Sequence, residues 1–162
     1  MLYESTQFTS KDQGFTLIEI LIALLIISVG LLGLARLQLV GIKNTQSGYL
    51  RSQVSFLGND IMERIQQNPD SAKSNAYDIA LTADPATTDC IGDAAKCSTT
   101  DMANFDLRIW KGYLANLLPS GNGSISSAAG ADETIFTITI QWFDEYQSEA
   151  TTQSATFTMS LP

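Results

Sequence analysis

The chain has 162 residues, a net charge of −8 and a pI near 4.3. This length fits one domain with an appendage, and an acidic chain with nine Lys and Arg residues lacks the basic surface that nucleic-acid binding requires. The sequence contains no histidine, which removes the commonest general base and metal ligand. Nucleic acid is therefore not an expected partner, and a structural role is favoured over catalysis.

The first predicted element is a long apolar helix that starts near residue 15. The 21 residues from Phe15 to Ala35 contain one charged side chain, Glu19, and two hydroxyls, Thr16 and Ser28. A helix of about 20 such residues spans the ~30 Å core of a bilayer. A carboxylate at the centre of such a helix costs roughly 2.5–3.5 kcal/mol. The presence of Glu19 therefore needs an explanation.

A cleavable secretory signal does not explain this segment. The apolar run exceeds the roughly 7–15 residues of a signal peptide, and no small-residue cleavage site follows it. The flanking charges, Lys11 before the run and Arg36 and Lys43 after it, orient the helix only weakly. An uncleaved anchor that holds a periplasmic domain is one interpretation, but it leaves Glu19 unexplained.

The stretch Gly14-Phe15-Thr16-Leu17-Ile18-Glu19 resembles the class III signal of type IV pilins and type II secretion pseudopilins. The resemblance implies that a prepilin peptidase removes a leader of residues 1–14, between Gly14 and Phe15, and N-methylates Phe15. Gln13 departs from the Lys or Arg that many prepilins carry before the glycine. The leader is also longer than in many major pilins, which favours a minor subunit.

The resemblance also implies a role for Glu19. After cleavage Glu19 would lie about 6 Å along the helix from the new amine, near the membrane face where a charge costs less. In the family this carboxylate pairs with the N-terminal amine of a neighbouring subunit, and two opposite charges that leave water together partly compensate each other. A water-solvated Glu19 without a partner is the alternative.

The helix is expected to continue beyond the membrane. Residues 15–40 form the transmembrane and assembly helix, and residues 41–68 form its amphipathic continuation, which ends at Asn68-Pro69-Asp70. Apolar residues recur there at three- and four-residue spacing, namely Leu50, Val54, Leu57, Ile61 and Ile65. Gly30 and Gly33 either permit local stretching or reflect the ordinary use of glycine in membrane helices.

Residues 69–162 are predicted to form a periplasmic globular domain. Its first part, residues 69–100, reads as a long irregular region. Cys90 and Cys97 are expected to form a disulfide if this domain lies outside the cytoplasm, and to be free thiols otherwise. Asp84, Asp89 and Asp93 could bind calcium, but their spacing is not that of an EF-hand. No metal site is therefore predicted.

A second helix is predicted over Asp101–Leu118, with Thr99, Thr100 or Asp101 as its N-cap. It ends at the turn cluster Pro119-Ser120-Gly121-Asn122-Gly123. Its apolar stripe is expected to pack in the core and consists of Phe105, Ile109, Trp110, Tyr113, Leu114, Leu117 and Leu118.

Two strands follow, because apolar residues alternate with Thr, Ser and Gln over Ile135–Phe143 and over Ala155–Leu161. The polar link Asp144–Gln153 would join them as an antiparallel hairpin, and a shorter strand near Ser124–Ser127 precedes them. The predicted fold is α+β, with a small antiparallel sheet packed on a long N-terminal helix. This arrangement matches the type IV pilin fold.

Short segments of the second half resemble PilV-type minor pilins, namely Trp110-Lys111-Gly112, Leu117-Leu118-Pro119-Ser120-Gly121 and Ile140-Gln141-Trp142. The resemblance implies a minor pilin, stored in the inner membrane as a single-pass protein, that primes or promotes type IV pilus assembly. Its implied partners are the prepilin peptidase, other minor pilins, the major pilin, the inner-membrane assembly platform and membrane lipid.

Three alternatives stay open at this point. They are an I-type minor pseudopilin of a type II secretion system, a signal-anchored periplasmic binding domain, and an adhesin at the pilus tip. An enzyme and a cofactor are not predicted, because the sequence has no P-loop, no nucleophile elbow and no metal-spaced cluster. Cys90 and Cys97 also lack the Cys-x-x-Cys spacing of a redox pair.

Overall fold

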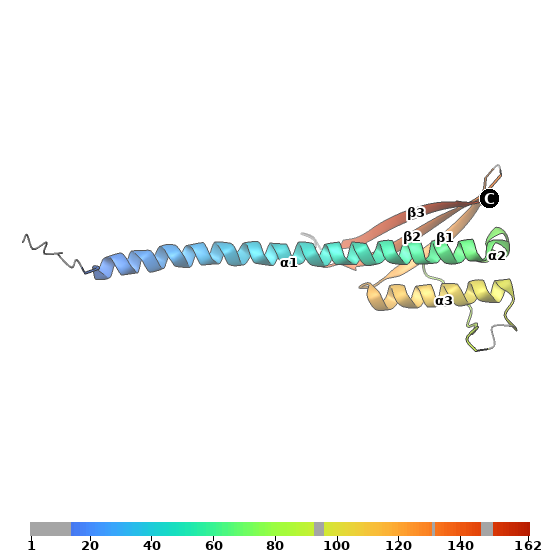
Figure 1. Cartoon of the computed structure of the whole chain (residues 1–162), viewed down its shortest axis with the longest axis horizontal. Helices are drawn as coiled ribbons and strands as arrows, with labels where there is room; N and C mark the ends of the chain where they lie inside the picture. Colours follow the sequence, from blue (N-terminus) through green and yellow to red (C-terminus); the bar gives the residue numbers. More distant parts are fainter. Residues whose placement is uncertain (1–13, 93–95, 131, 147–150) are drawn as a thin grey trace, which may run out of the picture. The chain divides into compact units, whose positions relative to one another are not determined.

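The computed structural model describes residues 14–92, 96–130, 132–146 and 151–162. Apart from Gly14, the expected leader lies outside the described residues, as does Asp93 of the weighed calcium ligands. Internal contacts divide the chain into two compact units, of which the first ends at Gly41 and the second runs from Ile42 to Pro162. In chain order the elements are α1 (Leu17–Gln67), α2 (Pro69–Lys73), α3 (Thr99–Leu117), β1 (Asn122–Ala129), β2 (Thr134–Asp144) and β3 (Thr151–Leu161) (Figure 1).

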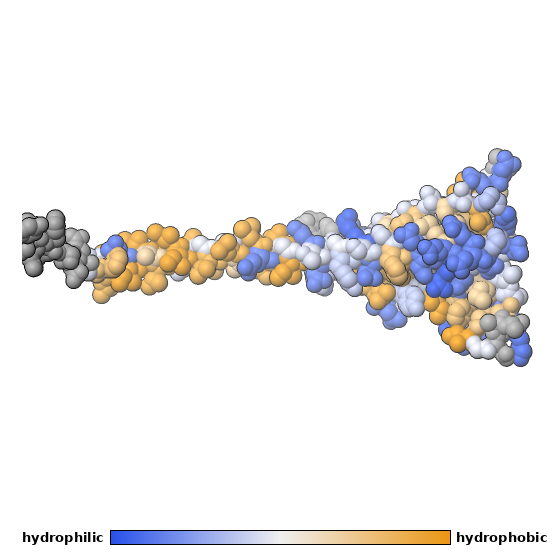
Figure 2. Space-filling model, viewed as in Figure 1, coloured by the Kyte–Doolittle hydropathy of each residue, from blue (hydrophilic) through white to orange (hydrophobic). Residues whose placement is uncertain are grey.

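The part of α1 in the first unit is exposed along its whole length among the described residues. Every described residue from 14 to 46 is exposed, and hydrophobic side chains cover most of this stretch of surface (Figure 2). Of the described helices, α1 alone is long and apolar enough to cross a membrane. It runs unbroken through Gly30 and Gly33, where an added Cβ would meet no atom within 4 Å. Intrachain packing therefore does not require either glycine.

The part of α1 in the second unit buries the predicted stripe. Leu50, Val54, Leu57, Ile61 and Ile65 are all buried, together with Ser47 and Gly58. The stripe covers one face because residues three and four apart lie on the same side of a helix. This prediction is confirmed.

The helix ends at Gln67, as the Asn68-Pro69 pair predicts. The segment that follows was predicted to be irregular, which is wrong for Pro69–Lys73, because these residues form the short helix α2. Proline disfavours a helix before it but fits the first turn of a new one, where its missing N–H is not needed. Asn68 is therefore both the break after α1 and the residue that precedes α2.

Helix α3 starts earlier than predicted, and its N-cap is Ser98 rather than Thr99, Thr100 or Asp101. The Ser98 hydroxyl accepts the Asp101 N–H at 3.1 Å, while an Asp101 carboxylate oxygen accepts the Ser98 N–H at 3.0 Å. This reciprocal pair is a capping box with Asp in place of the usual Glu or Gln.

The buried face of α3 is rotated from the predicted stripe. Trp110, Leu114 and Leu118 are buried as predicted, but Tyr113 and Leu117 are 47% and 44% exposed. The true core face also contains Ala103, Asp106 and Leu107. The prediction followed the aromatic residues of the neighbouring face. It left out Asp106 because an aspartate is not expected in a core.

The three strands form one antiparallel sheet in the order β1-β2-β3. Both predicted strands and the hairpin are confirmed, and the short first strand extends over Asn122–Ala129. On β2 the alternate residues Phe136, Ile138, Ile140 and Trp142 are buried. The result is the expected α+β arrangement of a long N-terminal helix and a small antiparallel sheet.

Two close approaches fasten α1 and α3 to the core face of this sheet. A Cβ on Gly58 of α1 would lie 2.7 Å from the Phe157 ring of β3, and a Cβ on Gly123 of β1 would lie 2.5 Å from the Trp110 ring of α3. The Trp110 indole N–H also donates to the Leu57 carbonyl of α1 at 3.0 Å.

Candidate functional site

The predicted processing bond lies just before α1. Gly14, Phe15 and Thr16 are not helical, and all three are exposed, with Phe15 80% exposed. Exposed, non-helical backbone is the kind that proteases cut. The backbone between Gly14 and Phe15 is therefore accessible in this chain.

Thr16 and Glu19 form the start of α1. The Glu19 N–H is 3.3 Å from the Thr16 hydroxyl oxygen, which accepts it, and the Ile20 N–H donates to the Thr16 carbonyl at 3.3 Å. Thr16 thus caps the helix, and the Glu19 carboxylate lies in the first turn, where the helix dipole favours a negative charge. This cap was not predicted from the sequence, although the pattern Thr-x-x-Glu before an apolar run is its signature.

Glu19 is the only charged side chain among the described residues that line the hollow around it. It lines a shallow hollow of about 370 Å³ with Phe15, Ile20, Ala23 and Leu24. Among the described residues, no Lys or Arg forms an ion pair with Glu19. A carboxylate on an apolar, unpacked helix surface can accept a cation from another molecule.

A second polar site lies at the other end of α1, where Arg64 bridges two helices. Its Nε is 3.0 Å from Asp60 Oδ2 on the same helix, and its Nη1 is 3.0 Å from Asp106 Oδ1 on α3. Burial lowers the pKa of Arg64, but the hydrogen bonds and charges of the two carboxylates outweigh this and raise it. Arg64 therefore stays charged and ties α3 to α1.

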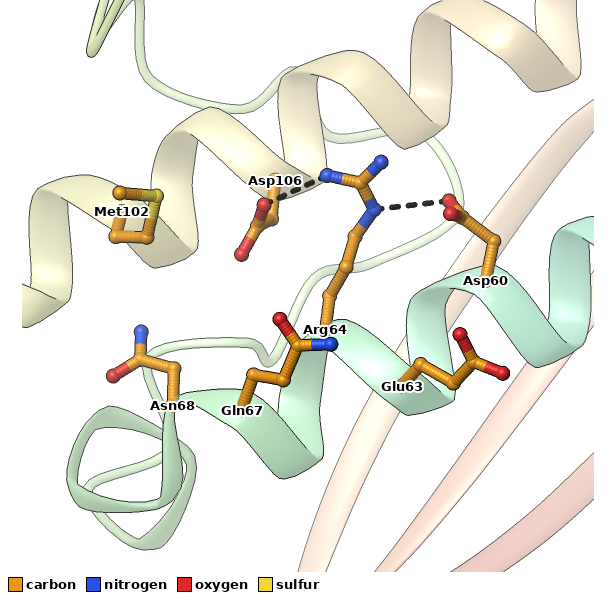
Figure 3. A pocket seen from close by; sticks show the side chains of 7 residues that line it. All are labelled: Asp60, Glu63, Arg64, Gln67, Asn68, Met102 and Asp106. Atoms are coloured by element: carbon orange, nitrogen blue, oxygen red, sulfur yellow. Dashed lines mark hydrogen bonds and ion pairs between the residues drawn. The ribbon is translucent and has the colours of Figure 1, made fainter. Parts of the chain in front are cut away.

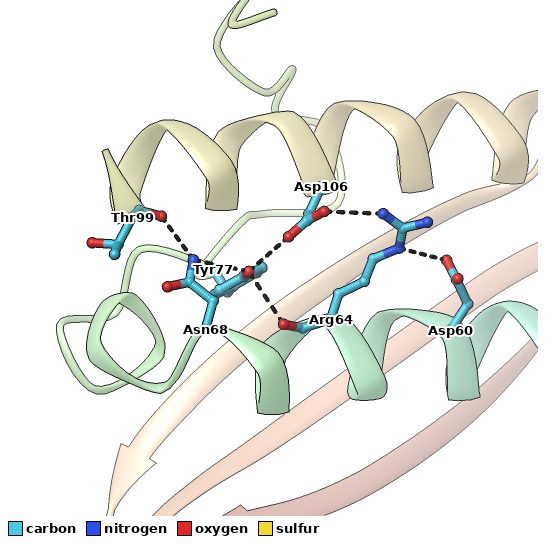
Figure 4. Close-up of polar contacts among 6 residues, drawn as sticks. All are labelled: Asp60, Arg64, Asn68, Tyr77, Thr99 and Asp106. Carbon is cyan, nitrogen blue, oxygen red and sulfur yellow. Dashed lines mark hydrogen bonds and ion pairs between the residues drawn. The ribbon is translucent and has the colours of Figure 1, made fainter. Parts of the chain in front are cut away.

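The same network continues through Tyr77, which is fully buried (Figure 4). Its hydroxyl donates to Asp106 Oδ2 at 2.8 Å. Asn68 donates to the Tyr77 oxygen at 3.2 Å and to the Thr99 carbonyl at 2.7 Å. Burial raises the pKa of Tyr77, and the Asp106 carboxylate raises it further. The neutral phenol is thus a structural donor that joins the end of α1 to α3.

A pocket of about 430 Å³ opens beside this network, lined by Asp60, Glu63, Arg64, Gln67, Asn68, Met102 and Asp106. Figure 3 shows Arg64 extending from α1 between Asp60 and Asp106. The Arg64 guanidinium contacts both carboxylates and offsets one of their two negative charges. Among the described residues no group of three or more His, Cys, Asp or Glu side chains could hold a metal ion. We therefore interpret the pocket as part of the structural contact between α1 and α3.

The irregular loop before α3 is held by a disulfide and by two cations that the sequence analysis did not identify. Cys90 and Cys97 form the expected disulfide. Arg108 donates to the Thr88 carbonyl at 3.2 Å. Lys111 donates to the Leu81 carbonyl and to Asn122 Oδ1, each at 2.8 Å. Burial lowers the pKa of Lys111, and the charge of Asp84 partly opposes this shift.

Among the weighed calcium ligands, Asp89 is engaged locally. Its Oδ1 accepts the Ile91 N–H at 3.1 Å and lies 3.9 Å from Arg108 Nη2. An aspartate that caps a turn and faces a guanidinium needs no cation to explain it.

Comparison with known proteins places two adjoining family models on this chain. Residues 9–35 match the prokaryotic N-terminal methylation motif, and residues 36–108 match the model described as type IV pilin Tt1218. No curated protein and no solved structure gives a significant match. The first match covers Gly14, Phe15 and Glu19, and the second covers the amphipathic half of α1 and part of α3. Together with the long N-terminal helix and the antiparallel sheet, these matches identify the chain as a type IV pilin-like prepilin.

Proposed function

We propose that this prepilin is a PilV-type minor pilin that primes or promotes assembly of a type IV pilus. Its segment of residues 15–40 anchors it once in the inner membrane, and the unit that follows lies in the periplasm. The observation that carries the proposal is Glu19, a carboxylate in the first turn of an exposed apolar helix that has no cationic partner among the described residues.

The proposed mechanism begins with cleavage between Gly14 and Phe15 by the prepilin peptidase and methylation of the Phe15 amine. The mature chain then carries a cation and a carboxylate within its first five residues. Burying either charge alone in an apolar helix bundle is expensive, whereas a matched pair is partly compensated. Glu19 of one subunit therefore receives the amine of a neighbouring subunit as the helices pack together, and this pairing sets their register.

The partners follow from this mechanism. Other minor pilins and the major pilin supply the complementary amines and carboxylates, and membrane lipid surrounds residues 15–40 before assembly. The inner-membrane assembly platform moves subunits into the filament. An I-type minor pseudopilin is the second candidate, because pseudopilins share the methylation motif. Loss of the chain would abolish twitching in the first case and protein secretion in the second.

The test is an intact mass and N-terminal sequence of the chain from membranes, with and without prepilin peptidase. We expect a mature chain that begins at methylated Phe15 only when the peptidase is present. Gly14→Ser should retain the leader, because the peptidase needs a residue without a side chain there. Gly33→Ser, at a glycine with open space around it, should be processed normally. A chain that keeps residues 1–14 in both backgrounds would refute the proposal.

A further inference from the structure

The two edges of the sheet differ. On the β1 edge, Ile79 and Ile125 exchange two backbone hydrogen bonds, each 2.9 Å, so the loop after α2 covers the centre of that edge. On the β3 edge, no described residue makes a backbone hydrogen bond to the side of the strand that faces away from β2. Figure 1 shows β3 as the outer strand.

The register identifies which groups the free edge presents. Because Ile125 gives its backbone groups to Ile79, its pair with Ile138 is not hydrogen-bonded, and the groups of Ile138 point toward β3. Ile138 is paired with Phe157, so the Phe157 groups point toward β2. The direction of the backbone N–H and C=O groups alternates along a strand, so the residues next to Phe157 point these groups away from β2. The outward set consists of exposed residues, namely Thr152, Ser154, Thr156, Thr158 and Ser160.

Among the described residues, this edge has none of the features that prevent strand pairing. β3 pairs with β2 in a continuous register from Thr151 to Leu161, without a bulge. In a chain of net charge −8, the strand contains no charged residue and no proline. Its core-facing residues Ala155, Phe157 and Met159 are only partly buried, whereas their β2 neighbours are fully buried. One more strand would cover this apolar flank.

The direction of β3 limits what this strand can be. Asp144 at the end of β2 is 2.6 Å from the Ser47 hydroxyl, and Thr151 is paired with Asp144. At its other end Leu161 shares a hollow with Lys73, which follows α1. β3 therefore runs in the same direction as the second half of α1, as does β1. In a second copy whose second unit has the same orientation, only β2 would run antiparallel to β3, and β2 is already paired on both sides. Such a copy could offer β3 only a parallel strand, and parallel pairing is slightly less stable per residue.

We propose that the free edge of β3 is the docking site for an antiparallel strand from a different polypeptide anchored in the same membrane. The partner strand alternates apolar residues, which extend the core beside Phe157 and Met159, with polar residues on the hydroxyl-rich outer face. Its backbone pairs with the outward N–H and C=O groups of alternate β3 residues, beginning at Ser154 and continuing through Thr156 and Thr158. The direction of the partner rests on the membrane anchoring proposed above, whereas the free edge does not.

The experiment isolates the full-length chain through a C-terminal tag from two kinds of membrane. In one, the chain is the sole prepilin, and in the other all prepilins of its genome are expressed. Residue-resolved hydrogen exchange of the β3 amides is then compared. We expect Ser154, Thr156 and Thr158 to exchange at least about tenfold more slowly in the complete set, as each gains a hydrogen bond.

Two variants separate edge pairing from folding. Thr156→Pro removes one outward N–H without touching the β2 ladder, because proline is tolerated on that side of an edge strand. This variant should keep its melting temperature, but the amount of co-purified subunit should fall by about tenfold. Thr156→Val keeps the N–H and should retain the co-purified subunit. Where Thr156→Pro fails to fold, Thr158→Lys supplies the charge that blocks edge pairing.

Several results would overturn the inference. One is equal exchange of the alternate amides in both preparations, and another is retention of the co-purified subunit by folded Thr156→Pro. The absence of any co-purified subunit would also overturn it. So would a disulfide-linked homodimer of Thr156→Cys in membranes with no other prepilin. The mass test of leader cleavage is independent of all four. Failure at this edge is therefore distinguishable from failure of the pilin assignment.

Discussion

At the scale of single residues, Glu19 combines two tasks that usually fall to different side chains. Its position in the first turn stabilises the start of α1, and its carboxylate is the only charge on the apolar helix surface around it. The local task tolerates several replacements, since Thr16 supplies the cap itself. The proposed pairing with a neighbouring amine tolerates none that lack a charge.

Glu19→Val should therefore be processed normally but assemble poorly, because the amine of a neighbouring subunit loses its counter-charge. The measurement is filament formation by electron microscopy, with the variant as the sole copy. Ser28→Ala is the matched control. It removes a hydroxyl of the same apolar stretch that donates to the Leu24 carbonyl of its own helix, and it should assemble normally. Normal piliation by Glu19→Val would contradict the pairing.

Gly123 is required by close packing rather than by backbone conformation. A Cβ there would lie 2.5 Å from the ring of Trp110, which is fully buried and hydrogen-bonded to Leu57, so the ring cannot move aside. Gly123→Ala should cost about 1–3 kcal/mol of unfolding free energy, measured by urea denaturation. Gly112→Ala, in α3 with open space around it, should instead stabilise by about 1 kcal/mol. Equal stability of the two variants would be inconsistent with this packing.

The raised pKa of Tyr77 predicts a loss of stability at alkaline pH. Below the ordinary tyrosine pKa of about 10, both the folded and the unfolded chain hold the proton. Above that pH the unfolded chain releases it while folded Tyr77 keeps it, so the unfolding free energy falls as pH rises. Urea denaturation between about pH 8 and 11 should show a shallower fall for Tyr77→Phe. An identical slope in both chains would exclude Tyr77 as the cause.

At the scale of the elements, the start of α3 depends on Ser98 and Asp101. Their reciprocal hydrogen bonds satisfy backbone groups that a helix end leaves unpaired. Ser98→Ala should reduce the unfolding free energy by about 0.5–2 kcal/mol, measured by thermal or urea denaturation. Thr100→Ala, at an exposed position in the same turn, is the matched control. A Ser98→Ala variant as stable as this control would argue against the cap.

The elements that the sequence predicts well are those with an uninterrupted period. The stripe from Leu50 to Ile65 and the alternation on β2 each depend on a single repeating spacing, and both are found as predicted. The error in the core face of α3 occurs where a polar residue takes a core position. Asp106 is buried because Arg64 and Tyr77 satisfy it, and both lie far away in sequence. No local pattern reveals such partners, so the face of α3 was rotated and the junction with α1 was missed.

At the scale of the whole molecule, every buried residue that the structure describes lies at or beyond Ser47. The second unit, from Ile42 to Pro162, therefore contains the described core, the disulfide and the sheet. A chain of residues 42–162 should fold cooperatively and stay soluble without detergent. Circular dichroism during heating and analytical ultracentrifugation would check this, in an oxidising buffer. Aggregation or a non-cooperative melt would show that the first unit is needed for folding.

The position of the Thr16 cap determines what the proposed leader cleavage changes at the start of α1. The described hydrogen bonds that start α1 all lie on the mature side of the Gly14–Phe15 bond. Hydrolysis would therefore leave the helix as long as before, but it would create an ammonium group beside a helix end that is already electropositive. One internal carboxylate relieves this repulsion only in part, and a second one from a neighbouring subunit would complete the relief. Leader cleavage would then set the time of assembly. The uncleaved subunit would stay unassembled in the membrane, and the cleaved subunit would bind other subunits.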